Sequence, residues 1–206
     1  MNVHSQPDQC KNMSDSELNV DKRQKIMDAA EKLIAESGFQ GLSMQKLAKE
    51  ARVAAGTIYR YFSDKEDLLL QVRLAVVQRN AEIIQQGVTN EMTLKQRFRK
   101  MWLNIFDLSG SNISTLKNRA QYDSLPCVRS HETKELERAM FSKVEQLFEE
   151  GREQGIFKPL ENPVLAALSL EVSVTLARKQ SLGYYHLDEK AIEAAIEASW
   201  DAITKH

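Results

Sequence analysis

The segment VAAGTIYRYFSDKEDL, residues 53–68, decides the fold of this chain. Ile58 and Phe62 stand four positions apart, so they fall on one helix face and predict a short helix over residues 54–61 with a buried stripe. Gly56 would let another backbone approach that helix closely. The remaining faces carry side chains that can bind phosphates or, for arginine, guanine edges: Thr57, Tyr59, Arg60 and Tyr61. The segment therefore predicts a helix that contacts a polyanion.

Two further short helices are predicted before this segment. Apolar residues at helical spacing indicate a helix over about 22–37, with Asp21 as its N-cap and Gly38 at its end in the left-handed conformation. Ser43 is expected to cap a second helix, whose apolar residues share one face: Leu47, Ala48 and Ala51. Three short helices with a tight turn between the second and third describe a helix-turn-helix, whose third helix can enter the major groove.

The rest of the chain also has helical periodicity, and no segment alternates as a strand does. Ser63 and Glu66 form a predicted capping box for a long helix that runs to about residue 86. Five more amphipathic helices are expected over about 94–110, 112–124, 132–150, 163–182 and 189–204. We predict an all-α fold of about nine helices. Its parts are a polar tail (1–20), a helix-turn-helix domain (21–66) and a larger helical domain (67–206).

Composition narrows the class of protein. The 206 residues are 42% hydrophobic and 28% charged, which is typical of a globular chain. The formal net charge is -1, and residues 21–66 hold nine Lys and Arg against seven Asp and Glu, so charge permits DNA binding without establishing it. The longest weakly charged run, 162–177, is too short to span a membrane, and the first residues match no secretory signal. Two cysteines, Cys10 and Cys127, form no disulfide framework, which favours the cytoplasm.

Residues 22–68 resemble the DNA-binding domain of the tetracycline-repressor (TetR) family. The family pattern has a glycine after the first helix, then an aromatic residue, a short helix, and Gly-Thr-apolar-Tyr-x-Tyr/His-Phe-x-x-Lys-x-x-Leu. The matching residues here are Gly38, Phe39, Leu47, Ala48, Val53, Gly56, Thr57, Ile58, Tyr59, Tyr61, Phe62, Lys65 and Leu68. Over residues 69–206 the resemblance extends to length and helical character alone.

The resemblance implies a homodimeric transcriptional regulator, usually a repressor that leaves a palindromic operator when a small molecule fills its C-terminal domain. The DNA-contacting residues that it implies are Ser43, Met44, Gln45, Ala55, Gly56, Thr57, Tyr59, Arg60, Tyr61 and Lys65. We expect Tyr59 and Lys65 to bind phosphates and Arg60 to read base edges. One position departs from the pattern, because Arg52 stands in the turn where the family usually has glycine. The turn is therefore either strained or of different geometry, or Arg52 reaches a phosphate.

Candidate effector-binding residues lie in the larger domain. Phe98, Trp102 and Phe106 repeat on one helix face, which is typical of a packed core and would also serve as a wall of a ligand cavity. The full candidate set adds a further aromatic residue and polar groups: Phe98, Trp102, Phe106, Tyr122, His131, Phe148 and Arg178. The aromatic content favours an apolar or aromatic effector. The common role of the family suggests control of efflux or detoxification genes.

No other chemical site is expected. The four histidines stand at no metal-ligand spacing, so neither a metal nor another cofactor is predicted. Cys127 lies four residues from His131 and is either a sensor thiol of lowered pKa or an incidental cysteine. A basic cluster is interpreted as the solvated face of its helix: Lys95, Arg97, Arg99 and Lys100.

Assembly and competing functions complete the expectations. Over 163–182 and 189–204, small residues lie among branched apolar residues. This composition suits either the core of a monomer or a four-helix dimer interface, and the family resemblance favours the dimer. No catalytic residues stand at a recognisable spacing, so an enzyme is not expected. The expected partners are double-stranded operator DNA and a small-molecule effector. The alternative is a protein-binding helical adaptor without specific DNA binding.

Overall fold

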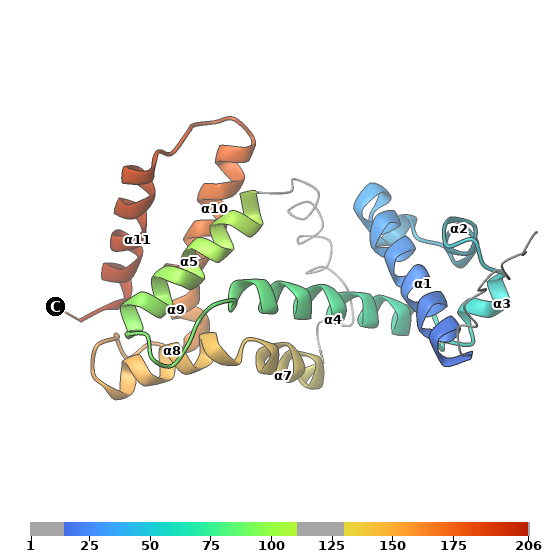
Figure 1. Ribbon diagram of the computed structural model, residues 1–206, viewed down its shortest axis with the longest axis horizontal. Helices are drawn as coiled ribbons and strands as arrows, with labels where there is room; N and C mark the ends of the chain where they lie inside the picture. Colours follow the sequence, from blue (N-terminus) through green and yellow to red (C-terminus); the bar gives the residue numbers. More distant parts are fainter. Residues whose placement is uncertain (1–14, 111–129, 206) are drawn as a thin grey trace, which may run out of the picture. The chain divides into compact units, whose positions relative to one another are not determined.

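The computed structural model describes residues 15–110 and 130–205 (Figure 1). Over these residues the fold is helical and contains no strand, which confirms the predicted all-α class; Phe157 and Thr204 form an isolated β-bridge. The chain divides into two compact units, Met1–Leu68 and Leu69–His206. In the described ranges no helix is long and apolar enough to cross a membrane. The predicted helix over 112–124, with Tyr122, lies outside the described residues, as do Cys10 and Cys127.

The first unit contains the three predicted short helices and the start of a longer one. Its elements are α1 (Asp15–Ser37), the 3-10 helix η1 (Phe39–Gly41), α2 (Met44–Glu50), α3 (Ala55–Ile58) and the first turn of α4 (Lys65–Ile84). Its core includes fully buried residues of α1, α2 and α3, together with Phe62 between α3 and α4: Ile26, Ala30, Ile34, Leu47, Ile58 and Phe62. The predicted stripe of Ile58 and Phe62 is therefore confirmed.

The ends of these helices differ from prediction at several positions. α1 starts at Asp15, so Asp21 is an interior residue whose carboxylate pairs with Lys25 one turn later (2.6 Å) and does not cap the helix. Gly38 does end α1 with a positive φ of 72°, but its ψ of 166° lies outside the left-handed helical region. α3 ends at Ile58 rather than at residue 61, although the backbone keeps turning, with Phe62 N donating to Ile58 O (3.0 Å).

The cap of α4 is displaced by one residue from the predicted box of Ser63 and Glu66. Asp64 Oδ1 accepts from the backbone N–H of Asp67 (2.7 Å), and Asp67 Oδ2 accepts from the backbone N–H of Ser63 (2.8 Å). The predicted box was wrong because Asp64 and Asp67 have the same three-residue spacing and also accept hydrogen bonds from N–H groups at a helix start.

The second unit is a bundle around α5. Its further helices are α5 (Leu94–Gly110), α7 (His131–Met140), α8 (Ser142–Glu153), α9 (Asn162–Leu168), α10 (Leu170–Ser181) and α11 (Glu189–Ile203). In Figure 1, α10 lies along α5, and α8 and α11 also contact α5. The predicted apolar face of α5 is buried throughout: Leu94, Phe98, Met101, Trp102, Ile105 and Phe106.

Two helices predicted as continuous are each broken into two. The predicted helix over 132–150 breaks at Phe141, where Gln85, just after α4, donates to Met140 O (2.8 Å) and accepts from Lys143 N (2.7 Å). The predicted helix over 163–182 breaks at Ser169, whose buried hydroxyl donates to Leu165 O (2.6 Å). Side-chain hydrogen bonds therefore satisfy backbone groups at both breaks. The last helix, α11, has the predicted extent to within a residue.

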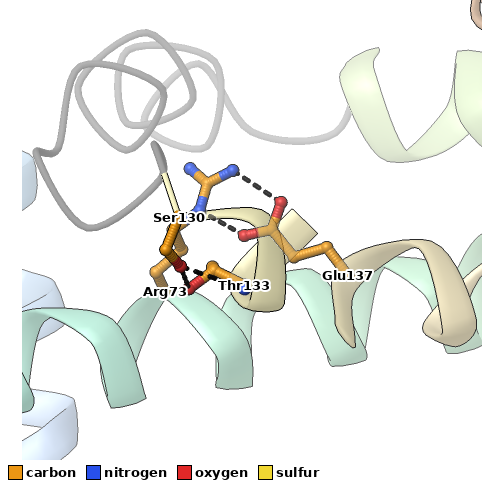
Figure 2. A network of polar contacts seen from close by, with 4 residues as sticks. All are labelled: Arg73, Ser130, Thr133 and Glu137. Atoms are coloured by element: carbon orange, nitrogen blue, oxygen red, sulfur yellow. Dashed lines mark hydrogen bonds and ion pairs between the residues drawn. The ribbon is translucent and has the colours of Figure 1, made fainter. Parts of the chain in front are cut away.

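Two buried arginines hold helices of the second unit together. Arg73 of α4 donates from Nε and Nη2 to the two carboxylate oxygens of Glu137 of α7, next to the Ser130 and Thr133 cap of that helix (Figure 2). Arg97 of α5 donates from Nη2 to Glu150 of α8. The prediction that Arg97 belongs to a solvated face is wrong, because this ion pair allows the guanidinium to be buried.

Candidate nucleic-acid interface

The turn between α2 and α3 is the most unusual backbone feature of the first unit. Val53 N donates to Ala48 O (3.0 Å) and Arg52 N donates to Lys49 O (3.3 Å), which are the two hydrogen bonds of a Schellman motif. This motif needs a positive φ at the residue after the C-cap, and that residue is Arg52, with a φ of 55°. Among the described residues it is the only non-glycine residue with a positive φ. The geometry is thus that of a glycine turn, and of the predicted alternatives the strained one is correct.

Ile58 and Phe62 anchor α3 and the turn after it, and the predicted contact residues surround these anchors. Ala55, Gly56, Tyr59 and Arg60 are exposed, with Tyr59 55% accessible, whereas Thr57, Tyr61 and Lys65 are half-buried. Tyr59 and Arg60 follow the last residue of α3, so they lie on the turn that leads toward α4. The described residues include no ion-pair partner for Arg60 or Lys65. Both cations therefore remain available to an external anion.

Gly56 is not required by the packing of the first unit. A Cβ placed on it would meet no atom of the protein within 4 Å, and its φ is not in the positive range. Neither the fold of the first unit nor the backbone conformation needs glycine at this position. The free space in front of Gly56 is open to a partner that approaches α3 closely.

The start of α2 contributes the second group of predicted contacts. Ser43 caps the helix as predicted, because its hydroxyl accepts from Lys46 N (3.2 Å). Ser43 and Gln45 are exposed and Met44 is half-buried. Helices α2 and α3 pack against each other, so both groups of predicted contacts belong to the same helix-turn-helix. The structure contains no DNA, and the individual contacts stay predictions.

A basic hollow on α2 was missed by the sequence reasoning. It has a volume of about 410 Å³ and is lined by Leu33, Lys46, Lys49, Glu50 and Arg52. Glu50 is paired with Lys32 (2.6 Å); this hydrogen bond lowers the pKa of Glu50 and raises that of Lys32. The signal in the sequence was the three-residue spacing of Lys46 and Lys49 on one face of α2, continued by Arg52 in the turn after it.

The predicted effector-binding residues fall into separate environments. Phe98, Trp102, Phe106 and Phe148 are buried in the core of the second unit, where Trp102 stacks on Phe106 with ring centroids 5.5 Å apart. His131 and Arg178 are exposed. The structure thus brings the aromatic members together in packed core, and the effector role of the set stays a prediction.

Comparison with protein families matches both units. The family described as bacterial regulatory proteins of the tetR type matches residues 26–72, which include the whole helix-turn-helix. The family described as the tetracyclin repressor-like C-terminal domain matches residues 93–204, which include most of the second unit.

Individual proteins are similar over nearly the whole chain. An uncharacterized HTH-type transcriptional regulator of Haemophilus influenzae is 33% identical over 92% of this chain and 99% of its own length. The structure of a TetR-family protein from Vibrio parahaemolyticus is 65% identical, with a TM-score of 0.82 over 90% of this chain and 100% of that one. A TetR-family regulator from Haemophilus influenzae has 31% identity and a TM-score of 0.75 over 91% of this chain and 99% of that one.

Proposed function

Because the chain belongs to the TetR family of transcriptional regulators, we propose that it is a cytoplasmic, ligand-responsive repressor that binds a palindromic operator as a dimer. A small apolar or aromatic effector would release it from the operator, and its targets would be efflux or detoxification genes. The observation that carries the proposal is the exposed surface of α3 around two buried anchors, with open space in front of Gly56.

Each group on this surface has a chemistry suited to one part of DNA. The Tyr59 hydroxyl and the Lys65 ammonium suit phosphate oxygens, which fix the position of the protein on the duplex. The Arg60 guanidinium suits the O6 and N7 acceptors of guanine in the major groove. Lys46 and Lys49 on α2 and Arg52 in the turn after it add positive charge, which would raise affinity without adding sequence preference.

A dimer would present two copies of this surface. The helices predicted to form the interface are α9, α10 and α11. These helices, with the C-cap residue of α10, carry exposed apolar residues that a partner could cover: Val164, Leu168, Leu182, Ala194 and Ala198. Two recognition helices in such a dimer would read half-sites about 34 Å apart, one turn of DNA, or a multiple of that distance.

The effector is proposed to act on the second unit, at the aromatic cluster predicted from the sequence. The rings there are in contact, and Trp102 Nε1 donates to Ser199 Oγ (3.3 Å). An effector that reaches these rings would therefore have to separate side chains that now pack against each other. Such a change would give the free and bound states different packing, which a switch needs.

DNA selection with the full chain tests the regulator proposal. Sequences enriched from a random pool should be palindromic, and their affinity measured by fluorescence anisotropy should fall steeply as salt rises, because phosphate contacts release counterions. Arg60→Ala should relax the preference at one base position of each half-site. Lys134→Ala, an exposed cation on α7, is the matched control and should change nothing. Equal affinity for selected and random DNA at every salt concentration would contradict the proposal.

A further inference from the structure

The two buried arginines of the second unit use their guanidinium groups differently. Arg73 donates from both Nε and Nη2 to Glu137, so both of these nitrogen atoms have a hydrogen-bond acceptor (Figure 2). Arg97 donates from Nη2 to Glu150, but its Nε has no hydrogen-bond partner. Over the described residues this is the one buried side-chain polar atom without a partner. Buried donors of this kind are rare in native proteins and call for an unseen acceptor.

Arg97 lines a surface hollow of about 410 Å³ at the start of α5, which we call the Arg97 hollow. Its volume falls within the range of about 300–1,000 Å³ that holds small molecules. Its wall is mostly apolar and includes Met92, Leu94, Ile156 and Trp200. Trp200 is fixed there by edge contacts with Phe98 and Phe157, whose ring centroids lie 5.3 and 5.2 Å away. The hollow therefore offers a rigid apolar face beside a buried cation.

The first turn of α5 adds positive potential to the same hollow. Thr93 and Gln96 form a capping box, in which Thr93 N donates to Gln96 Oε1 (2.8 Å) and Gln96 N donates to Thr93 Oγ1 (3.2 Å). The capping box provides acceptors for the N–H groups of Thr93 and Gln96 but not for those of Leu94 and Lys95. Leu94 and Lys95 also line the hollow. Free N–H groups at the positive end of a 17-residue helix favour an anion.

The carboxylates near the hollow limit how much negative charge it can accept. Glu150 accepts from Arg97 and from Gln146 (2.6 Å), and the hydrogen bond from Arg97 holds the pKa of Glu150 below its ordinary value. Glu197 pairs with Lys95 (2.6 Å). Both carboxylates are satisfied without the Nε of Arg97, so this donor can serve another acceptor. Their charges would repel a dianion more than a monoanion.

We propose that the Arg97 hollow binds a small organic monocarboxylate. Its carboxylate accepts from Arg97 and from the first-turn N–H groups of α5, and its apolar body lies against Ile156 and Trp200. Since Nε is covered by neighbouring side chains, the ligand displaces the rim, where Met92 is flexible and Gln154 is exposed. The inference goes beyond the proposed function, because no residue that lines the hollow belongs to the predicted effector-binding set, and binding there needs no operator.

The test uses the full chain without DNA, so its result does not depend on repression. Benzoate is the probe, and benzamide is its uncharged match in shape. With arginine labelled by ¹⁵N, the Nε–H resonance of Arg97, assigned by its loss in Arg97→Gln, should shift in a saturable way with benzoate and stay in place with benzamide. Equal shifts with both compounds, or none with either, would overturn the proposal and leave a bound water as the acceptor.

Two pairs of variants separate binding from folding. Arg97→Gln should weaken benzoate binding, measured by calorimetry, by about tenfold or more, whereas Arg99→Gln, an exposed arginine on the same helix, should leave it within twofold. Because Arg97→Gln leaves Glu150 without its cation, Ile156→Glu provides a second test that keeps the ion pair. It should abolish binding, and Ile156→Gln should retain it. Unchanged affinity in Ile156→Glu would overturn the proposal.

Discussion

Gly56 in α3 and Gly151 in α8 are both helical glycines, yet their surroundings are opposite. A Cβ on Gly151 would lie 2.7 Å from Cγ of Phe157, a fully buried ring that packs on Phe148 and Trp200. A Cβ on Gly56 would meet no atom within 4 Å. Gly151 is therefore needed by the packing of its own unit, whereas Gly56 has no internal reason to be glycine. A glycine of the second kind leaves open space, which is where we propose that DNA approaches the chain.

The largest effect is expected at the packed glycine. Gly151→Ala should lower the free energy of unfolding by about 2 kcal/mol, because overpacking a core costs about 1–3 kcal/mol and helix propensity returns at most about 1 kcal/mol. Urea unfolding measures the loss. Adding Phe157→Leu should recover part of it by removing the ring. Wild-type stability in Gly151→Ala alone would mean that Phe157 moves at little cost and that the contrast with Gly56 does not hold.

The open glycine should behave in the opposite way. Gly56→Ala should raise the free energy of unfolding by up to about 1 kcal/mol, because alanine is the better helix former. It should also weaken operator binding about tenfold, equivalent to about 1.4 kcal/mol, if DNA approaches α3 at this point. Anisotropy and urea unfolding on the same variant separate these two effects. Unchanged DNA affinity would show that the space in front of Gly56 stays empty in the complex.

The turn before α3 tests whether its strain serves the fold. Arg52→Gly should stabilise the first unit by about 1 kcal/mol or slightly less, because relief of the left-handed conformation is partly offset by the greater freedom of glycine in the unfolded chain. Arg52→Ala removes the same charge and keeps the strain, so its thermal midpoint should not rise. An equal rise in both variants would assign the effect to charge instead of backbone strain.

The smallest effect is expected at Tyr59, an exposed residue of the predicted contact set. Tyr59→Phe removes one hydroxyl and should weaken operator binding by about 0.5–1 kcal/mol, with the same loss on selected and random DNA. Because no charge changes, the salt dependence of binding should be that of the wild type. A loss restricted to the selected sequence would place Tyr59 at a base edge and not at a phosphate.

Local chemistry explains which parts of the fold could be predicted from the sequence. The Ser43 cap, the end of α1 at Gly38 and the buried pair of Ile58 and Phe62 each depend on residues within one or two helical turns, and the structure confirms them. Of the two breaks in the second unit, the one at Ser169 has a local hydrogen bond to Leu165, whereas the one at Phe141 involves a distant partner. The backbone on either side of Phe141 is hydrogen-bonded to Gln85, more than fifty positions earlier. The apolar periodicity continues unchanged through Phe141, so the sequence pattern gives no indication of the break.

The candidate sites divide in the same way. The exposed surface around α3 was predictable because buried and exposed residues alternate around two anchors in a single short segment. The burial of Arg97 was not, because its carboxylate partner stands 53 positions away on another helix. From sequence alone, basic residues on a helix predict a solvated face. The acidic partner that allows Arg97 to be buried is brought next to it only by the packing of α5 against α8.

The anchoring of α3 by Ile58 and Phe62 alone has an evolutionary consequence. Thr57, Tyr59 and Arg60 contribute little to the core, so most substitutions at these positions should change stability by less than about 0.5 kcal/mol. If these residues contact an operator as proposed, a population of variants can explore new operator sequences one substitution at a time without passing through unfolded intermediates. Recognition of DNA in this protein is free to diverge while the scaffold beneath it stays the same.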